Sequence, residues 1–99
     1  MFSMRPSDIH GTGCFANQKQ VKGCRWPIPA YRVPEETWHT LICEDGTIWD
    51  LYPPFNYLNH ADKPNAELIR HHGKFFLVIL KGIPADTEVT INYDTIEDM

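Results

Sequence analysis

The chain has 99 residues, of which 42% are hydrophobic and 22% charged, and its formal net charge is −4 with histidine neutral. This length accommodates a single domain, residues 1–99, with a modest core. The acidic balance disfavours direct nucleic-acid binding, which normally requires a basic surface, and no apolar run approaches the ~20 residues of a membrane-spanning helix.

The N-terminal sequence and the cysteines indicate a cellular compartment. The first residues, MFSMRPSDIHG, contain no apolar segment of the signal-peptide type. Cys14, Cys24 and Cys43 are an odd number without a Cys-x-x-Cys pair, which is typical of unpaired thiols in a reducing environment. We therefore expect a cytoplasmic protein, or one of the host nucleus if the source is a virus of eukaryotes. The spacing of cysteines and histidines does not fit common structural zinc sites, so we expect no metal.

Prolines and glycines divide the chain into short segments, a pattern that favours strands and turns over long helices. We expect strands at residues 14–16, 24–33, 47–51, 66–70, 74–80 and 89–92. Asp45-Gly46 and Gly73 predict hairpin turns between neighbouring strands. Only the segment from Pro34 to Thr40 favours a helix, because proline suits the first helical position and two glutamates follow in the first turn. The sequence thus predicts a mostly β protein with few short helices.

The first segment with chemical interest is HGTGCFA, from His10 to Ala16. Gly11 and Gly13 allow either a close approach of the backbone to a ligand or a tight turn with positive φ. A third glycine and a following long helix are both missing from the sequence, which excludes the dinucleotide-binding fingerprint.

Two further segments carry polar residues at unusual density. The sequence NYLNHADKPNAEL, from Asn56 to Leu68, is loop-like, and its asparagines and histidine either bind a ligand or satisfy the loop's own backbone. The sequence GIPADTEVTINYD, from Gly82 to Asp94, predicts an acidic turn and a strand that ends at Tyr93. A tyrosine at a strand end is commonly a core or interface residue.

The order and spacing of these segments resemble the SET-domain family of protein lysine methyltransferases, in a minimal form of viral or bacterial type. The family's Gly-x-Gly-x-Phe-Ala motif matches Gly11, Gly13, Phe15 and Ala16. Its Asn-His-x-x-x-Pro-Asn motif matches Asn59, His60, Pro64 and Asn65, with Ala61 in place of serine and Tyr57 as the preceding aromatic residue. Its C-terminal motif matches Glu88, Val89, Thr90 and Tyr93. The resemblance covers about residues 9–94.

The resemblance implies small β-sheets around a knot-like crossing, where the C-terminal segment passes beneath the Asn-His loop. It also implies S-adenosyl-L-methionine as cofactor, a lysine-containing protein as substrate and Tyr93 as the catalytic residue. The residues expected to bind the cofactor are His10, Gly11, Thr12, Gly13, Tyr57, Asn59, His60 and Tyr93. The acceptor lysine must be neutral, which costs roughly 4–5 kcal/mol at pH 7, and a dry aromatic channel would favour that form.

Several features leave a second interpretation open. Only residues 35–55 are available for the family's insert, and few residues follow Asp94, so the alternative is an inert SET-like module that binds cofactor or a basic protein segment. The aromatic residues Trp38, Trp49, Tyr52 and Phe55 are compatible with either of two locations, the walls of the lysine channel or the core. The position of a second channel tyrosine is held by Pro29 or by a shifted Tyr31, and the positions that set the degree of methylation hold Leu68 and Ile91. Exposed aromatic residues are also compatible with a homodimer.

Overall fold

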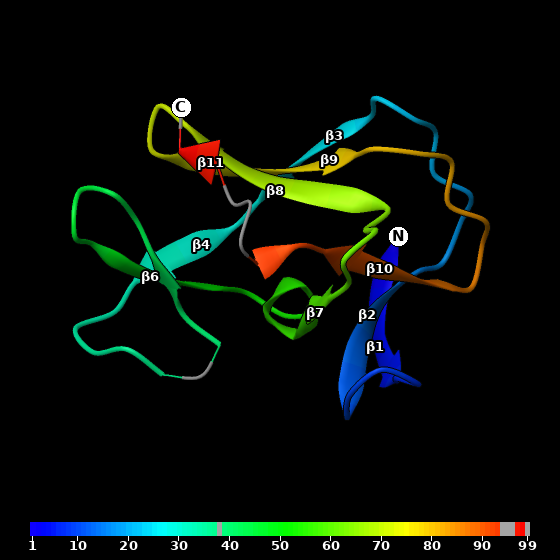
Figure 1. Cartoon of the computed structure of the whole chain (residues 1–99), viewed down its shortest axis with the longest axis horizontal. Coiled ribbons are helices and arrows are strands. Elements are labelled where there is room, and N and C mark those ends of the chain that lie inside the picture. Colours follow the sequence, from blue (N-terminus) through cyan, green and yellow to red (C-terminus); the bar gives the residue numbers. More distant parts are fainter. Residues whose placement is uncertain (38, 94–96, 99) are drawn as a thin grey trace.

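The computed structural model describes residues 1–37, 39–93 and 97–98, and within these ranges the protein is mostly β (Figure 1). The strands are β1 (Phe2–Pro6), β2 (Thr12–Ala16), β3 (Arg25–Ile28), β4 (Ala30–Arg32), β5 (Leu41–Ile42), β6 (Ile48–Leu51), β7 (Asn59–His60), β8 (Ala66–His71), β9 (Lys74–Ile79), β10 (Thr87–Ile91) and β11 (Glu97–Asp98). A 3-10 turn, η1 (Phe55–Tyr57), comes before β7. No described helix has the length and apolar character needed to cross a membrane.

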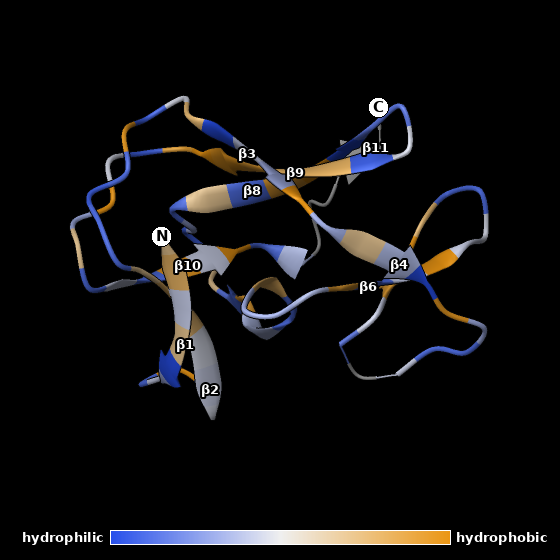
Figure 2. Cartoon of the chain, turned by 180° about the vertical axis from the view of Figure 1, so that it is seen from behind, coloured by the Kyte–Doolittle hydropathy of each residue, from blue (hydrophilic) through white to orange (hydrophobic). Residues whose placement is uncertain are grey.

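The strands form three small sheets, with orders β1-β2-β10-β7, β11-β8-β9-β3 and β4-β6-β5. In Figure 1, η1 and β7 lie in the middle, with β2 on one side and β6 on the other. Buried apolar residues of all three sheets, among them Val89, Leu68 and Leu51, form one core cluster. Figure 2 shows hydrophobic colouring along β9, while many of the connecting turns are hydrophilic.

The two predicted hairpins are confirmed. Their sequence signals are local, which explains why they could be predicted. Gly73 has a φ of +76° in the turn between β8 and β9, and Gly46 has a φ of +80° between β5 and β6. Glycine adopts this left-handed conformation without a steric penalty. Along β9 the side chains of Phe75, Leu77 and Ile79 are buried while the intervening ones are less so, the alternation expected of a strand with one face on the core.

Two predictions at the secondary-structure level are wrong. The strand expected over residues 24–33 is divided at Pro29 into β3 and β4, which belong to different sheets. The helix expected over residues 34–40 is absent from its described residues, and Trp38 lies outside them. Instead, the Thr37 N–H donates to Thr40 Oγ1, and that hydroxyl donates back to the Thr37 carbonyl, both at 2.9 Å. Such side-chain bonds compete with helix formation, and a segment of about seven residues is too short to nucleate one unaided.

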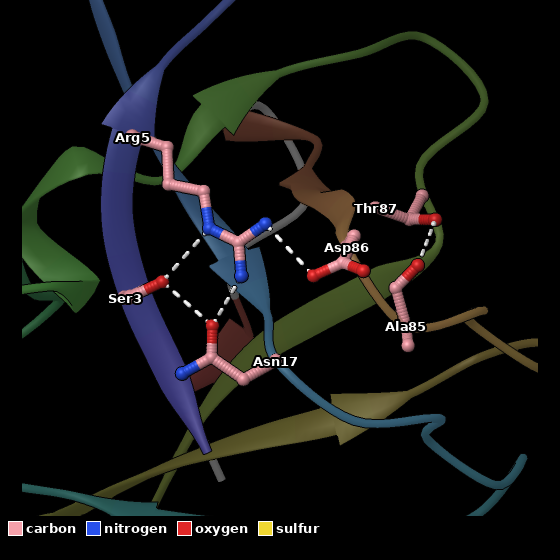
Figure 3. Close-up of polar contacts among 6 residues, drawn as sticks. All are labelled: Ser3, Arg5, Asn17, Ala85, Asp86 and Thr87. Atoms are coloured by element: carbon pink, nitrogen blue, oxygen red, sulfur yellow. Dashed lines mark hydrogen bonds and ion pairs between the residues drawn. The ribbon is translucent and has the colours of Figure 1, made fainter.

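Strand β1 was not predicted, and polar contacts fasten it to the rest of the sheet (Figure 3). It pairs antiparallel with β2. The Arg5 guanidinium donates to Asp86 Oδ1 at 2.9 Å, just before β10, and also donates to Ser3 Oγ and to Asn17 Oδ1. Ser3 Oγ donates to the same Asn17 oxygen at 2.7 Å. These contacts tie β1 to the end of β2 and to the turn before β10.

The expected crossing of the C-terminal segment is confirmed. Strand β10 pairs in parallel with β7, and β11 pairs in parallel with β8, so the last segment runs beside two successive parts of residues 59–71. Asn65 fastens the loop between β7 and β8 to β10: its Nδ2 donates to the Glu88 carbonyl, and its Oδ1 accepts the Thr90 N–H, both at 2.9 Å. The Asn-His loop and the strand that leads to Tyr93 are therefore held together.

Candidate functional site

A cavity of about 780 Å³ opens where the N-terminal turn, the Asn-His strand and the C-terminal strand meet. One side is formed by residues 9–12, from the β1–β2 turn, and by residues 55–60, from η1 and β7. Another side is formed by residues 39–44, which comprise β5 and the two residues on either side of it. Apolar lining comes from Leu51, Leu68, Phe75 and Ile91. The volume lies within the 300–1,000 Å³ range of small-molecule sites.

Tyr93 is held at this cavity by two contacts with the segment of Leu58 to His60. Its hydroxyl donates to the Leu58 carbonyl at 2.6 Å, and its backbone N–H donates to Nδ1 of His60 at 3.1 Å. The rings of Tyr93 and His60 have centroids 5.2 Å apart. Partial burial, followed by the negative charge of Glu88, raises the pKa of the phenol, so the hydroxyl is protonated at neutral pH. Because its proton is donated to Leu58, its lone pairs can accept a hydrogen bond.

His60 lies at the parallel junction between β7 and β10. It is paired with Ile91, and the next residue, Ala61, donates its N–H to the Ile91 carbonyl at 2.9 Å. His60 is among the residues that line the cavity, and its Nε2 lies 3.0 Å from Asp62 Oδ1. The imidazole therefore bridges the loop after β7 and the backbone of Tyr93.

Asn59 is 8% exposed, and its side-chain amide faces the N-terminal turn. Its Nδ2 lies 2.8 Å from Glu88 Oε2 and 3.1–3.2 Å from Ser7 Oγ and from the carbonyls of His10 and Thr12. The amide thus fixes residues 7–12 against β7 and β10.

The two glycines of the N-terminal motif serve different purposes. Gly11 has a φ of +43° with open space around it and lines the cavity. Gly13 does not line the cavity; a Cβ there would overlap Glu88 Oε2 and lie 2.8 Å from Glu88 Cδ and 3.1 Å from Ser7 Cβ. The close approach that requires glycine at position 13 is therefore an internal one.

The structure brings most of the predicted cofactor residues to one cavity. Those that line it are His10, Gly11, Thr12, Tyr57, Asn59, His60 and Tyr93. Their contact with a cofactor stays a prediction.

The uncertain aromatic positions are divided among the cavity, the core and the exposed surface. Phe55 lines the cavity, and Trp49 packs edge-on against Phe75 with centroids 5.8 Å apart. Tyr31 and Tyr52 pack on each other outside the cavity, at a centroid distance of 4.8 Å. Trp38 lies outside the described residues. Pro29, like Tyr31, is absent from the lining, whereas Leu68 and Ile91 belong to it.

Sequence reasoning gave no role at the cavity to Arg70 or His39, two lining residues that each pair with an aspartate. Arg70 is 9% exposed, and its guanidinium lies 5.3 Å from the ring centroid of Trp49 and 3.2 Å from Asp45 Oδ2. Hydrogen bonds from Thr47, with Arg70 adding to them, lower the pKa of Asp45 to about 2. His39 Nδ1 lies 3.0 Å from Asp50 Oδ1. Neither pair has a local sequence signal, because each joins residues from separate elements.

These features define a small β domain whose cavity is bounded by an N-terminal glycine turn, an Asn-His strand and a C-terminal tyrosine. The sequence model of the SET domain matches residues 9–94, and the chain therefore belongs to the SET-domain family. No curated protein sequence matches the chain significantly.

Solved structures share the fold at low sequence identity. A candidate histone methyltransferase of Plasmodium falciparum superposes with a TM-score of 0.72 at 18% identity, over 93% of this chain and 91% of that one. The SET domain of the RIZ1 tumour suppressor, PRDM2, superposes with a TM-score of 0.69 at 16% identity, over 95% of this chain and 69% of that one. The methyltransferase domain of human PR domain-containing protein 2 superposes with a TM-score of 0.64 at 16% identity, over 91% of this chain and 74% of that one.

Proposed function

We propose that the protein is an S-adenosyl-L-methionine-dependent protein-lysine N-methyltransferase. The observation that supports this most strongly is the double attachment of Tyr93 to Leu58 and His60 at the edge of a cavity of about 780 Å³. Family membership supports methyl transfer to lysine as the class of reaction. The cofactor supplies an electrophilic methyl group on a sulfonium centre.

The cavity residues are suited to two tasks. The backbone of residues 10–12 and 57–60 offers polar groups on one side, where the cofactor would lie, and residues 39–44 border another side, where the substrate would enter. Leu51, Leu68 and Ile91 are apolar and would disfavour a charged ammonium by desolvation. That helps to supply the neutral amine, and the Tyr93 hydroxyl would orient it by accepting an N–H.

The catalytic role of these residues is alignment. The cofactor would supply its methyl group to the amine nitrogen, and the residues that line the cavity would hold the two groups in line. The rate of such an in-line displacement depends mainly on how well the donor and acceptor groups are aligned. No nucleophilic side chain of the protein is required.

The proposal is tested by transfer of labelled methyl groups to lysine-rich protein, with Tyr93→Phe compared to wild type. We expect Tyr93→Phe to lower kcat by roughly 100-fold, as for loss of one oriented hydroxyl at a reacting centre. Tyr52→Phe is the matched control, because Tyr52 is 49% exposed and lies outside the cavity. A folded protein that binds the demethylated cofactor yet transfers no methyl group to any lysine would refute the proposal.

A second candidate function is an inert SET-like module that binds cofactor or a basic protein segment. It is favoured by the position of Tyr31, whose hydroxyl donates to Asp50 Oδ2 at 3.1 Å outside the cavity, so that a second channel tyrosine is not supplied from there. Calorimetric titration with S-adenosylhomocysteine and with a lysine-rich peptide separates the two. Binding of either ligand without any turnover would support the inert module.

A further inference from the structure

The two nitrogens of the His60 imidazole have different partners, and this difference fixes its tautomer. Nδ1 lies 3.1 Å from the backbone nitrogen of Tyr93, which can only donate a hydrogen bond. Nδ1 must therefore carry a lone pair. In a neutral imidazole the other nitrogen then carries the proton, so Nε2–H donates to Asp62 Oδ1 at 3.0 Å.

We propose that His60 is a positioning residue for Tyr93, and that protonation of its ring releases the Tyr93 backbone. The consequence for catalysis rests on the proposed function. An imidazolium has an N–H at both nitrogens and cannot accept a hydrogen bond. Protonated His60 would therefore direct an N–H against the Tyr93 N–H, and the contact between them would break.

The contact with Asp62 survives this change, since Nε2 keeps its proton in both forms. Of the two contacts described for Tyr93, only the one from its hydroxyl to the Leu58 carbonyl then remains. Tyr93 would then be held through its hydroxyl and no longer through its backbone N–H. Methyl transfer should therefore fall as His60 becomes protonated.

Other titratable and charged groups near the ring belong to several elements. Asp62, with a 97% exposed side chain, and Tyr93 contact it directly. The others that share the cavity are His10, Glu36, His39, Cys43, Glu44, Tyr57 and Arg70. Because each of them could add its own pH dependence, the test compares variants at position 60 within the same surroundings.

Asparagine and glutamine at position 60 form a matched pair. In His60→Asn the amide oxygen can occupy the place of Nδ1 and accept the Tyr93 N–H without titrating. In His60→Gln the amide lies one bond further out, near the place of Nε2, where it reaches Asp62 but not the Tyr93 N–H. Asp62→Asn keeps an acceptor for Nε2–H and serves as a control for the loop.

The first measurement needs no activity. Nitrogen-15 spectra of the histidine ring should show a proton on Nε2 and none on Nδ1 at high pH. The Tyr93 backbone amide signal should shift with the same midpoint as His60 in wild type and in Asp62→Asn. In His60→Asn that transition should be absent. A proton on Nδ1, or a Tyr93 amide that does not follow His60, would overturn the proposal.

The second measurement is the ratio of methyl-transfer rates, His60→Asn over wild type, as a function of pH. Deprotonation of the substrate lysine affects both proteins and cancels in the ratio. We expect the ratio to rise by about tenfold for each pH unit below the midpoint found by NMR, because one proton is involved. His60→Gln should be slow at every pH. A ratio that is flat across the midpoint contradicts the positioning role of His60. Complete inactivity of the wild-type protein contradicts the proposed function instead, and the NMR measurement then decides whether His60 positions Tyr93.

Discussion

Alanine at position 13 should destabilise the protein through Glu88. A Cβ on residue 13 would overlap Glu88 Oε2 and lie 2.8 Å from Cδ. The carboxylate cannot move without loss of its present contacts, since Ser7 Oγ donates to Oε1 at 2.6 Å and Asn59 Nδ2 donates to Oε2 at 2.8 Å. Hydrogen bonds to a charged group contribute about 1.5–3 kcal/mol each. We therefore expect Gly13→Ala to lower the free energy of unfolding by about 2–4 kcal/mol.

Urea and thermal unfolding measure this change, and a double-mutant cycle with Glu88→Ala tests its cause. Once the carboxylate is absent, Gly13→Ala should cost much less, because the two nearest atoms have been removed and only Ser7 Cβ, at 3.1 Å, still lies close to the new methyl group. Gly82→Ala is the control, since the nearest atom to its added Cβ is the Gln20 carbonyl oxygen at 3.9 Å. Additive effects of Gly13→Ala and Glu88→Ala would show that glycine is needed at position 13 for another reason.

Three further predictions concern the crossing, a surface carboxylate and a buried thiol. Asn65→Ala should cost about 2–4 kcal/mol in urea unfolding, because two hydrogen bonds to the β10 backbone are lost; a cost below 1 kcal/mol would mean that Asn65 does not hold the crossing. The pKa of Asp45 is lowered to about 2, so its charge stabilises the fold above pH ~4 and this contribution disappears toward pH 2; unfolding curves of Asp45→Asn should lack that part of the acid dependence, and unchanged curves would contradict it. Burial, with the charge of Glu88, raises the pKa of Cys14 to about 12, so maleimide should label this thiol at pH 8 only after unfolding; mass spectrometry that finds it labelled in the native protein would refute this.

The strands and turns that the sequence predicted correctly have local signals. The apolar run at Phe75 and the glycine turns at 46 and 73 depend on residues within a few positions of one another. Strand β1 has no such signal, because it is held by contacts such as that between Arg5 and Asp86, 81 positions apart. The failure at residues 34–40 has the opposite cause: the local helix pattern was present, but the Thr37–Thr40 contacts supplied an alternative.

The candidate site follows a similar division. Its lining could be anticipated because three motifs recur in a known order, and that order places Asn59, His60 and Tyr93 together. The motifs do not contain the internal contacts of these residues. That Asn59 faces the Ser7–Thr12 turn, and that Gly13 makes room for Glu88, depends on the relative placement of three strands, which no short segment specifies.

The position of β10 between β2 and β7 has a consequence during synthesis of the protein. Before β10 emerges from the ribosome, the β1–β2 pair lacks the strand that lies between it and β7 in the finished sheet. Folding of the region around the cavity must therefore wait until β10 emerges. Ribosome-bound chains arrested before that point should be open to proteases and chaperones at residues 55–65, and become resistant once β10 is released.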